Sequence, residues 1–453
     1  MGSGFTAGFL ATMVILAGLS IYMGIKHRGS AENSRTCKAA VVSGTIIGTL
    51  VGGSSTIGTA QLAYHFGMSA WWFTLGGGIG CLLMGVFFVS PLRRQGCDTL
   101  TGMISARYGQ NAGSLAAVLS SAGTYINLMA QLLSATSILS LFMPGADPAA
   151  ELIAAALLMI LYAFSGGIDG IGSVGILKTV LLYVASIGAG MYALYMFGGI
   201  SNIVNDPVLD KGAYFSLFAR GISTDLGAGA SLILGIVSTQ TYAQACLAGR
   251  TDRAARCGAL VSAVLVPPIG IGGILVGLYM RVNFPDLPDA KYAFTYFITQ
   301  YLPPALGGII TAALLIAVIG TGSGLALGVA TTIRRDLLDK KTALSRHVQK
   351  LFSIRRIIIL LLLSAALISA GEAGGIILDF SFMSMALRGA VLFVPLMCVL
   401  FIKKPVSSRY MLAAIIAGPA VVFAGNFFIE SFDPLFAGVG VSAIMAAIGL
   451  CKK

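Results

Sequence analysis

The chain has 453 residues, of which 57% are hydrophobic and only 10% are charged, and its formal net charge is +12. A soluble protein carries about 25% charged residues, so this composition excludes a soluble globular protein. The positive charge is spread over short loops between apolar runs, which argues against nucleic acid as a partner.

Apolar runs of about 20 residues recur along the whole chain, and this length crosses a bilayer core of about 30 Å. None of them alternates in polarity as a barrel strand would. The first run is too long for a signal-peptide core, so we expect a retained helix. We predict an all-α polytopic membrane protein with about thirteen transmembrane helices. The segments are about 4–25, 39–64, 70–91, 113–142, 149–166, 172–198, 226–246, 257–281, 305–333, 356–375, 378–402, 409–430 and 433–450.

The basic residues predict the orientation of these helices. If the N-terminus lies outside and the C-terminus inside, the cytoplasmic loops hold 23 of the 29 Lys and Arg residues. This bias is the positive-inside rule, and it predicts a multi-pass protein of the cytoplasmic (inner) membrane whose basic loops contact anionic lipid. The seven cysteines include no CxxC pair, and the three histidines are scattered, so no His/Cys metal site is expected.

Three connections between the segments are predicted to hold short surface helices. Two are outer connections, at about 199–225 and 283–308, and the second has an aromatic-rich centre that is typical of an interfacial helix. The third is the cytoplasmic stretch 99–109, with Thr99 near its start. No linker is long enough to separate soluble domains, so we expect one transmembrane domain over 1–453.

Segments two to six and seven to eleven form two groups of five with opposite orientation. We therefore divide the chain into a peripheral first helix, two inverted repeats and a peripheral C-terminal pair, at 1–38, 39–198, 226–402 and 409–453. Each repeat opens with an apolar helix that polar residues interrupt, "GGSSTIG" in the first and "GIVSTQTYAQ" in the second. Paired interruptions in inverted halves indicate the central site of a transporter.

The first interruption contains Gly52 and Gly53, which permit a backbone turn, followed by Ser54, Ser55 and Thr56, which supply hydroxyls. A broken helix leaves N–H and C=O groups unpaired at a cost of several kcal/mol each in lipid, unless protein or water lines the break. The freed carbonyls suit a small cation. The alternative is close helix packing through small residues.

Four motifs in chain order resemble the sodium/solute symporter family. They are "GTLVGGSSTIGTAQLAYHFGMSAWWF" followed by "PLRR" and "TLTGMISARYG", then "YAFSGGIDGIGSVGILKTVLL", "YAQACLAGRTDRAAR" and "AALLIAVIGTGSGLALGVATTIRRDLL". The resemblance covers most of 39–333 and is weak beyond it. It implies the leucine-transporter-type inverted-repeat fold with one extra N-terminal helix, and transport of a small solute by alternating access.

The resemblance also implies a sodium site, and here the sequence departs from the family. The family's sodium is held by carbonyls of the first core helix and by a hydroxyl pair on the eighth, with an acid nearby on the fifth. The hydroxyl pair falls on Gly320 and Thr321, and the acid falls on Gly175. One turn after Gly175 stands Lys178, where the family usually has an uncharged polar residue. The ion site or its replacement is then formed by Gly53, Thr56, Lys178, Gly320 and Thr321.

An ammonium at this place opposes a sodium ion. Two cations about 4 Å apart repel by roughly 4 kcal/mol at an effective dielectric of 20, which weakens binding about a thousandfold. We predict that Lys178 fills the ion's place, bonds to the freed carbonyls and Thr321, and is positioned to carry a proton. The alternatives are a conventional sodium symporter, with sodium near Thr321, and a Lys178 that extends to the lipid surface.

Buried hydroxyl and amide groups on the interrupted helices and on segment 113–142 suit a small polar solute. Arg388 is the only guanidinium well inside an apolar run, and a substrate carboxylate is one partner for it. The other is a structural acid, but Asp379 is nine residues away and badly placed. The predicted substrate-binding residues are Ser54, Ser55, Tyr125, Gln131 (with Asn127 one turn before it), Ser238, Gln240, Tyr242 and Arg388.

Other function classes fit the sequence less well. No nucleophile–base pair or carboxylate pair lies at membrane depth, so we expect no enzyme and no cofactor beyond sodium or a proton as coupling ion. No filter motif of a channel is visible. A transporter-like membrane sensor is a further alternative. We expect a monomer or weak homo-oligomer.

Overall fold

The computed structural model describes residues 2–26, 37–166, 171–338, 353–370, 375–404, 406–428 and 432–451. These residues are almost entirely helical, and the described part of the chain contains one isolated β-bridge, between Cys37 and Gly249, in place of any strand. The all-α prediction is therefore confirmed.

The first half of the chain begins with one continuous helix and goes on with a series of broken and curved helices. Its elements are α1 (Ser3–Lys26), α2 (Ala39–Leu50), η1 (Ser54–Gly58), α3 (Thr59–Phe66), η2 (Gly67–Trp71), α4 (Trp72–Leu83), η3 (Met84–Phe88), α5 (Val89–Arg94), α6 (Leu100–Tyr108), α7 (Gln110–Leu139), α8 (Pro148–Gly166), α9 (Ile171–Leu182), η4 (Tyr183–Ile187) and α10 (Gly188–Phe197).

The second half follows two short helices, α11 (Ile200–Val204) and α12 (Lys211–Tyr214). Its elements are α13 (Ile222–Val237), α14 (Gln240–Leu247), α15 (Asp252–Asn283), η5 (Ala290–Tyr292), α16 (Ala293–Tyr301), α17 (Pro304–Thr332), η6 (Ile333–Leu338), α19 (Ile354–Ala370), α20 (Ile377–Phe401), α21 (Ser408–Phe428) and α22 (Pro434–Cys451).

All three predicted surface helices are present. The connections 199–225 and 283–308 contain α11, α12 and α16, and the stretch 99–109 contains α6. Thr99 caps α6, because its hydroxyl accepts a hydrogen bond of 2.9 Å from the amide of Gly102. Such a cap satisfies an amide that the first helical turn leaves unpaired.

Eight helices of the described residues are long and apolar enough to cross a membrane, or nine if α13 and α14 form one bent span. Four further apolar helices are shorter, and α2 is one of them. The run Ser54–Arg94 counts as one of the eight, although the sequence predicts parts of two helices there. The multi-spanning architecture is confirmed, and the count of thirteen stays a prediction.

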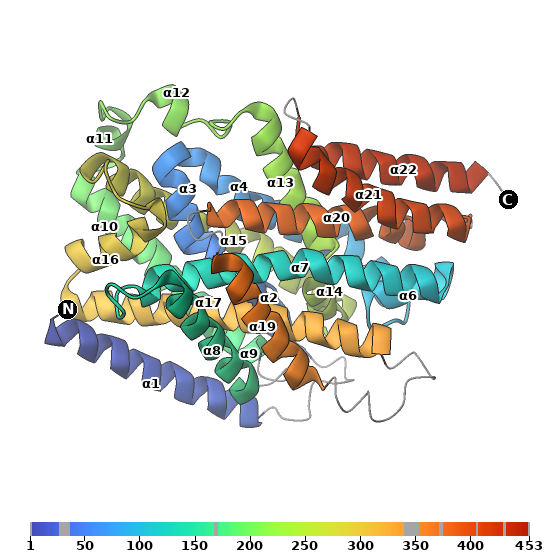
Figure 1. Ribbon diagram of the computed structural model, residues 1–453, viewed down its shortest axis with the longest axis horizontal. Helices are drawn as coiled ribbons and strands as arrows, with labels where there is room; N and C mark the ends of the chain where they lie inside the picture. Colours follow the sequence, from blue (N-terminus) through green and yellow to red (C-terminus); the bar gives the residue numbers. More distant parts are fainter. Residues whose placement is uncertain are drawn as a thin grey trace.

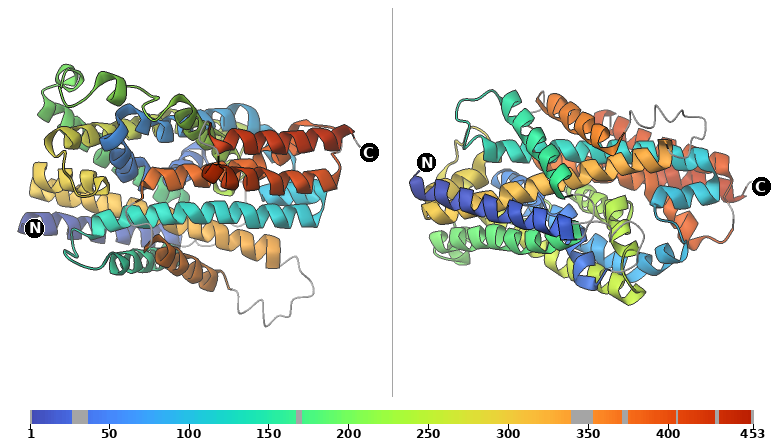
Figure 2. Two further views of the ribbon diagram at one scale, coloured as in Figure 1. Left: turned by 45° about the horizontal axis from the view of Figure 1, so that its top comes forward. Right: turned by 90° about the horizontal axis from the view of Figure 1, so that it is seen from below.

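The arrangement separates a central group of helices from a peripheral one. α7 and α20 run side by side through the middle of the bundle, with α17 next to α7 (Figure 1). Within the most apolar stretches of α17 and α20, 78% of residues are buried inside the protein, against 33% in α22. α1 packs along α17, and α21 and α22 pack on each other beside α20 (Figure 2).

The two ends of the chain lie at opposite ends of the bundle, with α6 near the C-terminal end and α11 and α16 near the N-terminal end (Figure 1). This placement is what an odd number of crossings requires. Which end faces the cytoplasm rests on the charge pattern of the loops, so we call the end with α6 the predicted inner end and the other the predicted outer end.

Candidate functional site at the two interrupted helices

The first interruption lies between α2 and η1, where the chain is extended at Val51. Gly53 has ordinary helical dihedrals (φ −62°, ψ −40°), so it is not there for a turn that only glycine can make, as the sequence analysis supposed. The reason is space. A Cβ atom on Gly53 would lie 2.2 Å from the Cβ of Ser134, and one on Gly52 would lie 2.6 Å from the hydroxyl of Thr321. These two glycines let α7 and α17 approach the break.

Side chains satisfy the amides that the break leaves unpaired. The amide of Gly52 donates to the hydroxyl of Ser55 at 3.0 Å, and the amide of Gly53 donates to Oε1 of Gln131 at 3.0 Å. The carbonyl of Gly52 accepts hydrogen bonds of 2.9 Å from both Ser55 and Thr56. Ser55 and Thr56 therefore bond to the backbone of the break itself.

Lys178 of α9 bonds to the freed carbonyl at the end of α2. Its side chain is buried, and Nζ donates to the carbonyl of Gly48 at 2.6 Å and to the hydroxyl of Thr321. The same hydroxyl lies 3.3 Å from the carbonyl of Val51 and 3.0 Å from that of Ala317. The amine thus sits between α2, α9 and α17, and it does not extend to a lipid surface.

The predicted ion-site residues do not all meet there. The carbonyl of Gly53 accepts from the amide of Gly58 at 2.9 Å, and Thr56 bonds to Gly52, so neither touches Lys178. Gly320 faces α8, where an added Cβ would lie 3.4 Å from the hydroxyl of Tyr162. The structure brings Lys178 and Thr321 together with Gly48 and Val51, two carbonyls that the sequence analysis did not name.

Gly175 leaves no room for the acid that relatives of this pattern carry. A Cβ atom on Gly175 would lie 2.1 Å from the carbonyl oxygen of Gly44, and one on Gly48 would lie 2.9 Å from the Cα of Gly175. α2 and α9 are therefore in close contact through three glycines. Because the helices are so close, the longer side chain of Lys178, one turn on, reaches the end of α2.

A second polar network joins the break to α7 and α20. Nε2 of Gln131 donates to the hydroxyl of Ser54 at 3.0 Å, and the hydroxyls of Ser54 and Ser381 lie 2.6 Å apart. Ser381 donates in turn to Oδ1 of Asn127 at 3.2 Å. All four side chains are buried. Of the predicted substrate-binding residues, Ser54 and Gln131 thus lie together here.

The second interruption separates α13 from α14, whose axes differ by 44°. Thr239 is extended there, and its hydroxyl donates to the carbonyl of Gly235 at 2.6 Å. Nη1 of Arg388, on α20, donates to the same hydroxyl at 3.0 Å. The remaining bonds of this fully buried guanidinium go to Ser384, whose carbonyl and hydroxyl accept at 3.1 and 3.0 Å, and to the sulfur of Met385.

Four ion pairs are recorded among the described residues, and neither Lys178 nor Arg388 takes part in one. Among the described residues, both cations are therefore bonded to uncharged acceptors, which are oxygens for Lys178 and oxygens and one sulfur for Arg388. Asp379, which the sequence analysis considered a poor partner for Arg388, lies 3.4 Å from Nη1 of Arg220 instead.

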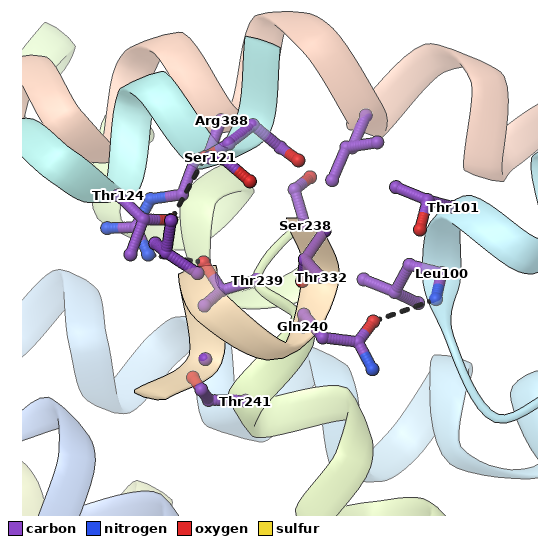
Figure 3. Close-up of a pocket in the computed structure, with 14 residues that line it drawn as sticks. Leu100, Thr101, Ser121, Thr124, Ser238, Thr239, Gln240, Thr241, Thr332 and Arg388 are labelled. Atoms are coloured by element: carbon purple, nitrogen blue, oxygen red, sulfur yellow. Dashed lines mark hydrogen bonds between the residues drawn. The ribbon is translucent and has the colours of Figure 1, made fainter. Parts of the chain in front are cut away.

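A pocket opens beside the second interruption, between α7, α14, α17, α20 and the start of α6 (Figure 3). Gln240 lines it but is held by α6, because its Oε1 accepts from the amide of Leu100 at 2.8 Å. Ser238 and Thr241 also line it, and their hydroxyls have no hydrogen-bond partner among the described residues. The lining residues are Leu100, Thr101, Ser120, Ser121, Thr124, Ser238, Thr239, Gln240, Thr241, Gly328, Val329, Thr332, Arg388 and Leu392.

Five predicted substrate-binding residues lie outside this lining. Three of them, Ser54, Ser55 and Gln131, belong to the first interruption, and the other two are Tyr125 and Tyr242. The hydroxyl of Tyr125 is 2.9 Å from that of Ser364 on α19, and Tyr242 is buried with an unpartnered hydroxyl. The sequence analysis missed Ser381, Ser384 and Thr239. A signal for two of them exists, since Ser381, Ser384 and Arg388 recur at spacings of three and four, which places them on one helix face.

A charged cluster lies at the predicted outer end of the central helices. Nε of Arg220 lies 2.9 Å from Oδ1 of the buried Asp225, and the guanidinium lies over the ring of Phe382 at 5.2 Å. Phe382 in turn packs edge-on against Phe73 of α4, with ring centroids 5.8 Å apart. The pocket beside Arg388 has Leu100 and Thr101 of α6 in its lining, so it lies toward the predicted inner end, whereas this cluster lies toward the other end.

Comparison with known proteins agrees with this geometry. The chain is similar to the sodium/pantothenate symporter of Escherichia coli (strain K12). The two are 23% identical over an alignment of 467 positions that covers 97% of this chain and 95% of that protein. It is 22% identical to the high affinity choline transporter 1 of Homo sapiens, over 86% of this chain and 71% of that one.

A solved structure of a Na⁺-coupled sialic acid symporter, in a substrate-bound outward-open state, superposes with a TM-score of 0.77 at 16% identity, covering 99% of this chain and 98% of that chain. This likeness shows the fold. The family model "Sodium:solute symporter family" matches residues 33–418. The chain is a membrane transporter and not an enzyme, and it belongs to the sodium:solute symporter family.

Proposed function

We propose that this protein is a secondary active transporter that moves a small polar organic solute by alternating access, and that the ammonium of Lys178 takes the place of the coupling sodium ion. Membership of the family supports a sodium-coupled solute transporter, with sodium as the expected coupling ion. The observation that carries our departure from this expectation is the pair of bonds from Nζ to the carbonyl of Gly48 and the hydroxyl of Thr321.

A sodium ion does not fit these residues as they stand. The freed carbonyl of Gly48 and the hydroxyl of Thr321 are the oxygens such an ion would use, and the amine already bonds to both. A sodium ion beside the ammonium would meet a repulsion of roughly 4 kcal/mol at about 4 Å. Position 175 supplies no carboxylate to offset this repulsion, because glycine carries no side chain and the structure has no space for one there.

The cluster at Arg220 and the pocket beside Arg388 support alternating access. In this proposal the cluster closes one end of the central helices, and the pocket is a polar cavity on the other side of the interruptions. If the basic loops face the cytoplasm, this arrangement is closed to the outside. The two coupling modes compatible with Lys178 are a proton carried by its amine and no coupling ion.

The test is counterflow in proteoliposomes that contain the purified protein. Labelled candidate solutes, with pantothenate and choline included because relatives carry those names, are offered with either sodium or N-methyl-D-glucamine as the cation. We expect exchange that sodium does not stimulate. Lys178→Met, which keeps the length of the side chain without its charge, should lower exchange by tenfold or more.

The conventional sodium-coupled symporter is the second candidate, favoured by the family and by the named relatives. Strong stimulation by sodium together with an unaffected Lys178→Met variant would reject our proposal in its favour. Size-exclusion profiles and melting temperatures of wild type and variant show whether a loss of exchange reflects unfolding.

A further inference from the structure

Two facing rows of polar groups connect the two interruptions along the contact between α7 and α20. On α20, Ser381, Ser384 and Arg388 share one face. Ser381 bonds to Asn127 of α7 at 3.2 Å, and the hydroxyl of Ser384 donates to the carbonyl of Gly123 on the same helix at 2.5 Å. The row ends at Arg388, in the wall of the pocket shown in Figure 3.

Arg388 is the one charged residue among the described residues that line this pocket. A guanidinium has five N–H donors. Its bonds go to two oxygens of Ser384, to the hydroxyl of Thr239 and to the thioether of Met385, which is a weak acceptor. One N–H of Nη1 is left over. A buried charge without a counter-ion is costly, and that cost falls when an anion enters the pocket.

A second, independent observation comes from Ser238. This residue is fully buried and lines the same pocket, yet its hydroxyl has no partner in the described structure. The hydroxyl of Thr241, also in the lining, is equally without a partner. Buried polar groups are nearly always hydrogen-bonded, so donors that stay unused beside a lone guanidinium indicate a ligand that accepts hydrogen bonds.

We infer that the pocket beside the second interruption binds the carboxylate of a small anionic solute, with Arg388 as its counter-ion and Ser238 as a further donor. This inference rests on the proposed function, since it names the class of solute that the transporter carries. The described residues that line the pocket include no acid to receive an amine or a quaternary ammonium group, and the carboxylate of Asp336, behind the lining, accepts from Thr101. The guanidinium of Arg388 opposes a cation in the pocket. A carboxylate matches the donor geometry of a guanidinium.

The experiment measures binding to the purified full-length protein, so it needs no flux. The probes are the potassium salts of glycolate, lactate and pyruvate, each paired with its uncharged amide, and potassium chloride at equal concentration. Isothermal calorimetry and thermal unfolding report binding. We expect at least one carboxylate to bind more than tenfold more tightly than its amide and than chloride.

Three variants test the residues. Arg388→Gln should weaken carboxylate binding about tenfold to a hundredfold, and Arg388→Lys should weaken it less. Ser238→Ala should weaken it severalfold. The melting temperature of the ligand-free protein should stay unchanged or rise, because removing this hydroxyl breaks no recorded hydrogen bond. Arg256→Gln, an exposed arginine outside the pocket, is the matched control and should bind as wild type does.

The inference is overturned if the amides or chloride bind as well as the carboxylates, if no carboxylate binds, or if Ser238→Ala and a folded Arg388→Gln both retain full affinity. These outcomes are separate from the counterflow result. If the protein binds a carboxylate but shows no exchange, the proposed transport function is rejected and the carboxylate site stands. If it shows exchange without a preference for carboxylates, the carboxylate site is rejected and the transport function stands.

Discussion

At the scale of single residues, the close contact between α2 and α9 depends on glycines, which carry no Cβ atom. A Cβ atom on Gly175 would lie 2.1 Å from the carbonyl oxygen of Gly44 and 2.7 Å from its carbon, and both are backbone atoms that cannot swing aside. Lys178 reaches Gly48 because these helices touch. Gly175 is thus a condition for the lysine's position.

Gly175→Ala should therefore destabilise the protein. Overpacking of this kind costs about 1–3 kcal/mol, so the melting temperature in detergent should fall by several degrees. Solute exchange in the counterflow experiment should fall as well, because α2 and α9 move apart. Gly188→Ala is the control, because a Cβ there meets nothing within 4 Å, and it should be neutral or slightly stabilising. Equal melting temperatures for the two variants would contradict the role given to Gly175.

The sequence alone could identify Lys178, Thr321, Ser54, Gln131 and Arg388 as unusual, because charge and polarity inside apolar runs need no coordinates to be seen. It could not identify Gly48 and Val51, which contribute only backbone carbonyls. It also misassigned the purpose of Gly52 and Gly53, since the conformation of a break and the space around it look the same in the sequence. Tyr125 faces α19, a choice that depends on helix rotation.

At the scale of elements, the two interruptions differ in which side chains bond to their backbone groups. Backbone groups of the first bond to side chains of α7, α9 and α17, whereas α14, the half-helix after the second, is held at its far end by Arg93. Nη1 of Arg93 donates to the carbonyls of Cys246, Leu247 and Gly249 at 3.0, 3.0 and 2.7 Å. A cation at a helix C-terminus also complements the helix dipole.

Arg93→Gln should consequently loosen α14. The change also removes the bond of 2.6 Å from Nε to Asp252, whose carboxylate is half exposed. Because hydrogen bonds from a charged donor contribute about 1.5–3 kcal/mol each, we expect a loss of about 2–4 kcal/mol and faster amide exchange in a peptide that covers 240–250. The neighbouring Arg94 is exposed, which makes Arg94→Gln a control with the same change of charge. Unchanged exchange in the Arg93 variant would show that packing alone holds the half-helix.

The elements themselves were largely predictable from hydropathy and from the polar interruptions. α6, α11, α12 and α16 lie where the sequence places short surface helices, and the C-terminal pair α21 and α22 lies at the periphery beside α20. The curvature was not predictable. The π-helical turns η3 and η4 occur within apolar stretches, where hydropathy does not mark them.

At the scale of the whole molecule, the charge moved in each cycle distinguishes the coupling schemes. A carboxylate that crosses without a metal ion carries one negative charge, while Lys178 and Arg388 stay with the protein. A sodium-coupled cycle carries net positive charge if it brings two or more sodium ions with one carboxylate. A membrane potential acts on these two cycles with opposite sign, at about 2.3 kcal/mol per charge for each 100 mV.

We therefore expect an inside-positive potential, imposed with valinomycin and an inward potassium gradient, to accelerate uptake of [¹⁴C]lactate, or of the tightest-binding carboxylate, into sodium-free proteoliposomes at equal pH on both sides. Liposomes without valinomycin are the control. If the amine of Lys178 delivers one proton with each carboxylate, the cycle is electroneutral, the potential has no effect, and an inward proton gradient drives uptake instead. Uptake that requires sodium and is accelerated by an inside-negative potential would show that the metal ion, and not the lysine, drives the cycle.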